Sequence, residues 1–186
     1  MAQHLLNIPN MLTLLRIIMT PVIVYMVLTG EAWTAVILMV IAGITDMLDG
    51  AIARYFDQRT SVGGYLDPIA DKIMLISLIV SLFFMGQVPL FVFLAIVFRD
   101  IIIVLGAITY EMLTHQLTMQ PSLISKATTL MQITYIALLL LHMASPIPPL
   151  LLQSAMWLAF MLTCASGLHY MISWTSKAAH HEEEVR

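Results

Sequence analysis

The sequence has little charge and almost no cysteine, and both shortages exclude classes of protein. Only 10% of its 186 residues are charged, whereas a soluble domain carries about 25%. Too few polar side chains are therefore present to coat a water-soluble globule. The single cysteine, Cys164, excludes an intramolecular disulfide. No nucleic-acid-binding motif is present either, so we expect no nucleic-acid partner.

What is present is apolar and comes in long runs. Hydrophobic residues make up 60% of the chain, and the mean hydropathy is +0.93. Six runs approach the roughly 20 residues needed to cross the hydrocarbon core of a membrane. They lie at 11–29, 33–56, 68–86, 88–112, 123–143 and 149–174. Turn residues separate them, for example Gly30, Gly63, Gly64, Gly86 and Pro149. The pattern predicts an all-α integral membrane bundle of six transmembrane helices.

The ends of the chain are more polar than these runs. Residues 1–10 are predicted to form an amphipathic segment along the membrane surface. The first run lacks the basic flank and cleavage site of a signal peptide, so we interpret it as a retained helix. Residues 176–186 include His180, His181 and three glutamates, and they are predicted to form a solvated tail. Residues 1–175 then form the membrane domain.

Positive charge is distributed unevenly between the two predicted sides of the membrane. The loops at 30–32, 86–87 and 144–148 contain no Lys or Arg. Cytoplasmic loops carry an excess of these residues, so we predict that both termini and the 57–67 loop are cytoplasmic, in an inner membrane. Arg99 is the one basic residue that this assignment places deep within a span.

Aspartates gather at the predicted cytoplasmic end of the second and third runs. One helical face of the second run carries acids and small residues: Asp46, Asp49, Gly50, Ala53 and Asp57. On the third run, Asp67 and Asp71 are four residues apart and share a face, and Pro68 suits a first helical turn. Two short helical faces, joined by a loop that contains glycine, thus bring four carboxylates together.

Four carboxylates this close repel one another unless some are protonated or a cation lies among them. Acidic oxygen ligands suit Mg²⁺ or Mn²⁺, and these ions suit phosphate. Arg54, beside the acids, would meet phosphate oxygens. The alternative for a single aspartate is a structural pair with Lys or Arg between helices. For all four at these spacings we favour a functional site, because charge within a membrane is costly.

Together these residues resemble the signature of the CDP-alcohol phosphatidyltransferase family (class I). The matching pattern is Asp46-x2-Asp49-Gly50-x2-Ala53-Arg54-x8-Gly63-x3-Asp67-x3-Asp71. Residues 7–16, Asn-Ile-Pro-Asn-Met-Leu-Thr-Leu-Leu-Arg, resemble the bacterial phosphatidylglycerophosphate synthase branch. Six spans and cytoplasmic termini are similar to that branch as well, so the resemblance covers nearly the whole chain except the tail.

The resemblance implies transfer of a phosphatidyl group from CDP-diacylglycerol to an alcohol, with release of CMP. It implies two ions of Mg²⁺ or Mn²⁺, bound by Asp46, Asp49, Asp67 and Asp71. Asp71 would also be the general base that takes the proton of the acceptor hydroxyl. Further residues would lie near the nucleotide: Asn10, Thr13, Gly50, Ala53, Arg54 and Gly63. The family is commonly homodimeric, so a homodimer is implied too.

Two acceptors are compatible with the sequence. Arg99 and Asp100 lie together in the fourth run, where isolated charges are costly. They form a structural ion pair, or else Arg99, with Lys126, binds an acceptor phosphate. The stretches 99–104 and 121–132 resemble cardiolipin synthases of mitochondrial type, which use phosphatidylglycerol. The glutamate and second arginine typical of phosphatidylglycerophosphate synthases are absent. We therefore favour phosphatidylglycerol, a lipid acceptor, with glycerol 3-phosphate as the alternative.

Two other classes of protein also use intramembrane aspartates. An intramembrane prenyltransferase would combine them with Mg²⁺ and a diphosphate, but such enzymes have more spans and lack this glycine and alanine pattern. A divalent-cation transporter would need polar residues through the full depth of the membrane. Here the acids gather at one end of the predicted bundle, and Glu31 is the only acidic residue in the loops on the opposite side.

Overall fold

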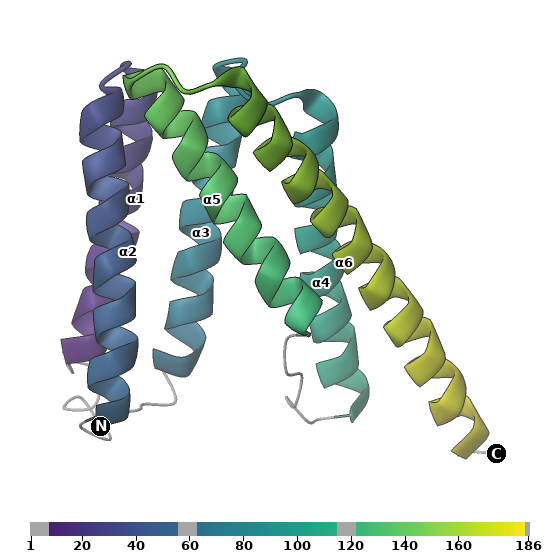
Figure 1. Cartoon of the computed structure of the whole chain (residues 1–186). Helices are drawn as coiled ribbons and strands as arrows, with labels where there is room; N and C mark the ends of the chain where they lie inside the picture. Colours follow the sequence, from purple (N-terminus) through teal and green to yellow (C-terminus); the bar gives the residue numbers. More distant parts are fainter. Residues whose placement is uncertain (1–7, 56–62, 115–121, 185–186) are drawn as a thin grey trace. The chain divides into compact units, whose positions relative to one another are not determined.

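The computed structural model describes residues 8–55, 63–114 and 122–184, and all regular structure in these ranges is helical (Figure 1). Six helices follow one another: α1 (Ile8–Leu28), α2 (Ala32–Tyr55), α3 (Gly63–Phe84), α4 (Leu90–Thr114), α5 (Leu123–Ala144) and α6 (Pro149–Glu184). Each helix overlaps one of the predicted runs. The predicted all-α class is therefore confirmed, and six helices lie within the described ranges; that all six cross a membrane stays a prediction.

Two of the connections begin with glycine caps of the same kind. Gly30 and Gly86 have φ angles of +82° and +72°, which residues with a side chain rarely adopt. After α1, the amide of Glu31 donates to the carbonyl of Met26 at 2.9 Å, and the connection after α3 repeats this bond. These bonds form the Schellman pattern, which satisfies carbonyls at a helix end. The predicted breaks at these two glycines are confirmed.

The helix α3 begins earlier than predicted. It includes Gly63 and Gly64, which we expected in a loop, and Pro68 is its sixth residue rather than part of its first turn. Glycine has a low helix propensity, which explains the wrong prediction. The first four amides of any helix have no partner within it. Pro68 lies beyond them and leaves one carbonyl without its usual amide donor, but the helix continues through it. As a result, Asp67 and Asp71 lie on successive turns of one continuous helix.

The ends of the chain are also partly helical. Ile8 to Asn10 form the first turn of α1 rather than a separate surface segment, and residues 1–7 lie outside the described ranges. The helix α6 continues to Glu184, so the backbone of the predicted tail is helical over most of its length. The division into a membrane domain and a solvated tail stays a prediction.

The chain divides into two compact units. One comprises residues 1–88 and 136–147, and the other comprises 89–135 and 148–186. In the first unit α1 packs against α2 and α3, and Ile23, Ala42 and Ile79 are fully buried. In the second unit α4 packs against α6, where the ring centroids of Phe91 and Phe160 are 5.1 Å apart.

Large apolar side chains are exposed on the helices, including Ile18, Phe98 and Ile172. Three described helical stretches are long and apolar enough to cross a membrane: Asn10–Leu28, Leu123–Ala144 and Pro149–Ser173. A shorter apolar stretch, Ala32–Leu48, lies in α2. Exposed apolar side chains on such helices fit a lipid environment rather than water.

Candidate functional site

A buried polar stripe runs along one face of α1. Asn10, Thr13, Arg16 and Thr20 are spaced by three, three and four residues, so they project from the same side of the helix. None of the four is more than 3% exposed. The hydroxyl of Thr20 donates to the carbonyl of Arg16 at 2.9 Å, within α1 itself. The side chains of Thr13 and Arg16 instead contact the aspartates of the neighbouring helices.

Arg16 joins the two halves of the acidic signature. Its Nη2 lies 2.7 Å from Oδ1 of Asp46 on α2, and its Nη1 lies 2.5 Å from Oδ1 of Asp71 on α3. The Arg16 side chain is 0% exposed, whereas those of Asp46 and Asp71 are 43% and 49% exposed. The arginine is therefore enclosed by the three helices, and the carboxylates remain accessible.

Asp67, the third aspartate of the signature whose side chain is described, is also held by α1. The hydroxyl of Thr13 donates to Oδ1 of Asp67 at 2.6 Å. Hydrogen bonds to a charged acceptor are short and stronger than those between neutral groups. Asp46, Asp67 and Asp71, which periodicity predicted to meet, thus share contacts with one face of α1.

The other predicted residues of this site are described only by their backbone. Asp49, Gly50, Ala53 and Arg54 lie on α2, and Gly63 begins α3; their side chains are outside the described part of the structure. Asn10 is buried. The assigned roles in metal and nucleotide binding stay predictions for all of these residues.

Arg16 is the residue that the sequence interpretation missed. We named it only as the end of the 7–16 stretch and took Arg99 as the one basic residue deep within a span. The structure shows that Arg16 is fully buried inside the protein as well, and the depth of either arginine in a membrane stays a prediction. The signal was available, because a charge inside an apolar run must find a partner.

The accessible side chains offer the type of ligand atom that a hard divalent cation prefers. The accessible groups are carboxylate oxygens from α2 and α3, which Mg²⁺ and Mn²⁺ prefer over nitrogen or sulfur ligands. Among the described side chains alone, no three acids, histidines or cysteines form a complete metal site. The predicted ligand set also includes Asp49, whose side chain is not among them.

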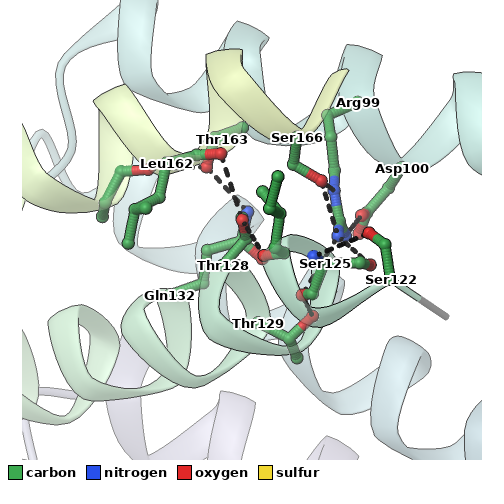
Figure 2. A network of polar contacts seen from close by, with 12 residues as sticks. Arg99, Asp100, Ser122, Ser125, Thr128, Thr129, Gln132, Leu162, Thr163 and Ser166 are labelled. Atoms are coloured by element: carbon green, nitrogen blue, oxygen red, sulfur yellow. Dashed lines mark hydrogen bonds and ion pairs between the residues drawn. The ribbon is translucent and has the colours of Figure 1, made fainter. Parts of the chain in front are cut away.

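A second polar cluster, in the other unit, surrounds Arg99 (Figure 2). Nη1 of Arg99 donates to Oδ1 of Asp100 at 2.7 Å, and Nη2 donates to Oγ of Ser125 at 2.6 Å. Nε and Nη2 both lie 3.3 Å from Oγ of Ser166 on α6. The side chains of Arg99 and Asp100 are only 2% and 5% exposed. Each of the three guanidinium nitrogens thus has a partner inside the protein.

The same cluster continues between α5 and α6. Thr128 donates to the carbonyl of Leu162 at 3.0 Å, and Nε2 of Gln132 donates to Oγ1 of Thr163 at 3.0 Å (Figure 2). Polar side chains commonly join helices in membranes in this way. The buried Oε1 of Gln132 has no hydrogen-bond partner within the described residues.

The two predicted acceptor-binding residues, Arg99 and Lys126, differ in burial. Arg99 forms the ion pair with Asp100 that we considered as one of two alternatives. Lys126 is exposed near the start of α5. A role for either residue in acceptor binding stays a prediction. The sequence interpretation did not single out Ser125 and Ser166, since a serine in an apolar helix is common and carries no signal of its partner.

Comparison with known proteins gives one consistent family. Residues 6–165 match the model of the CDP-alcohol phosphatidyltransferase family. A probable CMP-forming cardiolipin synthase of Drosophila melanogaster is 35% identical over 92% of this chain and 58% of its own length. The human CMP-forming cardiolipin synthase is 33% identical over 70% of this chain and 49% of its own length.

A bacterial relative carries a different name. The CDP-diacylglycerol–glycerol-3-phosphate 3-phosphatidyltransferase of Aquifex aeolicus is 35% identical over 67% of this chain and 70% of its own length. The matches thus cover between 49% and 70% of the length of these three relatives. The family match also removes the prenyltransferase and cation-transporter alternatives. Since the match covers most of the chain and includes the whole acidic signature, the protein belongs to the CDP-alcohol phosphatidyltransferase family.

Proposed function

We propose that the protein transfers the phosphatidyl group of CDP-diacylglycerol to a hydroxyl of phosphatidylglycerol, forming cardiolipin and releasing CMP. The observation that carries this proposal is the cluster of accessible carboxylates on α2 and α3, held together through Arg16 within the family-matched region. In the reaction, the acceptor oxygen forms a bond with the lipid-side phosphorus. The bond between that phosphorus and the bridging oxygen of the diphosphate breaks.

The carboxylates divide the work between binding and proton transfer. Asp46, Asp49, Asp67 and Asp71 would hold two divalent cations, Mg²⁺ or Mn²⁺. When bound, such cations neutralise the diphosphate and stabilise the charge of the leaving nucleotide. Asp71 accepts the proton of the attacking hydroxyl, a task within the reach of a positioned carboxylate.

The nucleotide is assigned to the small residues of the signature. Gly50, Ala53 and Gly63 lack bulky side chains and allow close approach to the backbone. Arg54 meets phosphate oxygens, as arginine does in many phosphate sites. Asn10 and Thr13 belong to the same region, and the hydroxyl of Thr13 is already shared with Asp67.

Charge supports phosphatidylglycerol over glycerol 3-phosphate. A dianionic acceptor needs more positive charge than a phosphodiester, and the charge of Arg99 is balanced by Asp100 at 2.7 Å. The names of the Drosophila and human relatives point the same way. The Aquifex relative supports glycerol 3-phosphate as the second candidate acceptor.

The setting of the reaction is the membrane. Apolar helices and the family support an integral membrane protein. The distribution of Lys and Arg supports cytoplasmic termini and a cytoplasmic active site in an inner membrane. We also propose a homodimer, on the basis of the family alone.

The proposal is tested by a product assay on protein purified in detergent. Purified protein with Mg²⁺ or Mn²⁺ and CDP-diacylglycerol receives phosphatidylglycerol or glycerol 3-phosphate separately, and both CMP and the lipid product are measured. Cardiolipin from phosphatidylglycerol alone is the expected result. Phosphatidylglycerophosphate from glycerol 3-phosphate alone would establish the second candidate. No CMP with any alcohol, from folded protein, would overturn the proposed activity.

A further inference from the structure

Arg16 contacts two acids of the signature, Asp46 on α2 and Asp71 on α3. We propose that Arg16 is a positioning residue that sets both the geometry and the charge of the carboxylate centre. This inference rests on the proposed function, because it concerns how the same centre accepts a divalent cation and a diphosphate. Arg16 acts through Asp46 and Asp71, whose carboxylates it contacts directly.

The geometric part of the inference follows from the guanidinium group. Its two terminal nitrogens contact carboxylates on different helices, Nη2 with Asp46 and Nη1 with Asp71. The planar fork of arginine fixes the separation of two such partners, whereas the ammonium of lysine is a single point charge. Arg16 therefore fixes α2 and α3 at the position where each carries an acid of the signature.

The position of Arg16 is itself fixed by α1. Its side chain is completely buried, and Thr13, one turn earlier, holds Asp67. A rigid support of this kind is what keeps catalytic groups in a productive arrangement. The helix α1 thus acts as the third wall of the centre, although the sequence signature lies entirely on α2 and α3.

The electrostatic part follows from counting charges. Four ionised aspartates would carry −4, and two divalent cations would cancel this charge. Arg16 then adds one positive charge to the loaded centre, in addition to that of Arg54, and this positive charge is complementary to an anionic diphosphate. The same positive charge lies close to the carboxylates that bind the cations, so it weakens cation binding and allows the cations to exchange.

The experiment measures Mn²⁺ binding to detergent-purified protein without substrate, together with the thermal unfolding temperature with and without Mn²⁺. For Arg16→Gln we expect Mn²⁺ to bind at least about tenfold more tightly, because a repulsive neighbouring charge is gone. The rise in unfolding temperature on adding Mn²⁺ is expected to be larger than in the wild type. Turnover is expected to fall, since Asp46 and Asp71 lose their common support.

Two further variants separate this role from a structural one. Leu78→Ala truncates a buried core residue of α3 away from the acids, so it should lower stability while leaving the Mn²⁺ affinity unchanged. Arg16→Lys keeps the charge but not the fork. It should bind Mn²⁺ within about twofold of the wild type and still lose turnover. This variant also serves if Arg16→Gln does not fold.

The possible results are distinguishable. Unchanged Mn²⁺ affinity in Arg16→Gln, with an active wild type, would overturn this inference and leave the proposed function intact. An Arg16→Lys variant with much tighter Mn²⁺ binding, or with full turnover, would overturn it as well. A wild-type protein that neither binds Mn²⁺ nor releases CMP would overturn the proposed function and the inference together.

Discussion

Arg16 and Arg99 are both buried arginines paired with aspartate, but the aspartates differ in exposure. The partners of Arg16 have side chains that are 43% and 49% exposed, whereas the partner of Arg99 is 5% exposed. In the first case the arginine leaves accessible carboxylates on which a ligand can act. In the second the pair is closed, and serines from two other helices complete it. The two clusters therefore differ in the exposure of the acid rather than in the burial of the arginine, and the cluster with the exposed carboxylates is the candidate reactive centre.

The comparison predicts that an Asp→Asn substitution has different effects in the two clusters. Asp71→Asn should lower turnover strongly, because it removes the base, and should weaken Mn²⁺ binding, because it removes one anionic ligand. Its cost in stability should stay small, because the side chain keeps its shape and Arg16 keeps Asp46 as a partner. A general base contributes about 10²- to 10⁴-fold to the rate, so kcat should fall by that factor. CMP release under saturating substrates measures it. Turnover like that of the wild type would remove Asp71 as the base.

Asp100→Asn should instead affect stability. It leaves Arg99 charged and buried without its counter-ion, and breaking a buried pair costs about 3–5 kcal/mol. The double change Arg99→Met with Asp100→Leu should cost clearly less than Asp100→Asn, because no unpaired charge remains. Unfolding in detergent, measured for each variant, gives these free energies. A double variant less stable than Asp100→Asn would contradict a mainly structural pair.

The helices and the grouping of the aspartates on α2 and α3 could be predicted because they depend on local sequence pattern. The apolar runs and the glycine caps at Gly30 and Gly86 are short-range signals, and the spacing of the aspartates places them on common faces. The start of α3 was missed since glycine propensity is a weak guide when packing supports a helix.

The pairings could not be predicted because they join distant parts of the chain. Arg16 and Asp71 are separated by 55 residues, and Arg99 and Ser166 by 67. Nothing in the sequence near Ser166 indicates a charged partner. The cost of burying a charge in a membrane predicts that partners exist, but only the packing of the helices identifies them.

A smaller effect is expected from the hydroxyl that supports Asp67. Thr13→Val keeps the shape of the side chain and removes the 2.6 Å hydrogen bond. A bond to a charged group contributes about 1.5–3 kcal/mol, so kcat/KM should fall roughly 10- to 100-fold. Thr134→Val is the control, because that exposed hydroxyl bonds only to a carbonyl of its own helix. An unchanged kcat/KM in Thr13→Val would show that Asp67 needs no support from α1.

The smallest effect is expected where the polar cluster around Arg99 continues between α5 and α6, at Gln132. Gln132→Leu removes one hydrogen bond to Thr163, and such bonds between membrane helices contribute about 0.6 kcal/mol on average. It also removes Oε1, a buried oxygen without a described partner, so the two effects should cancel and leave stability unchanged within about 1 kcal/mol. Thr163→Val should cost more, since it leaves the amide of Gln132 unpaired as well. In unfolding measurements the double variant Gln132→Leu with Thr163→Val should therefore be no less stable than Thr163→Val alone. A loss above about 2 kcal/mol for Gln132→Leu would mean that this glutamine makes contacts as important as those of the charged pair.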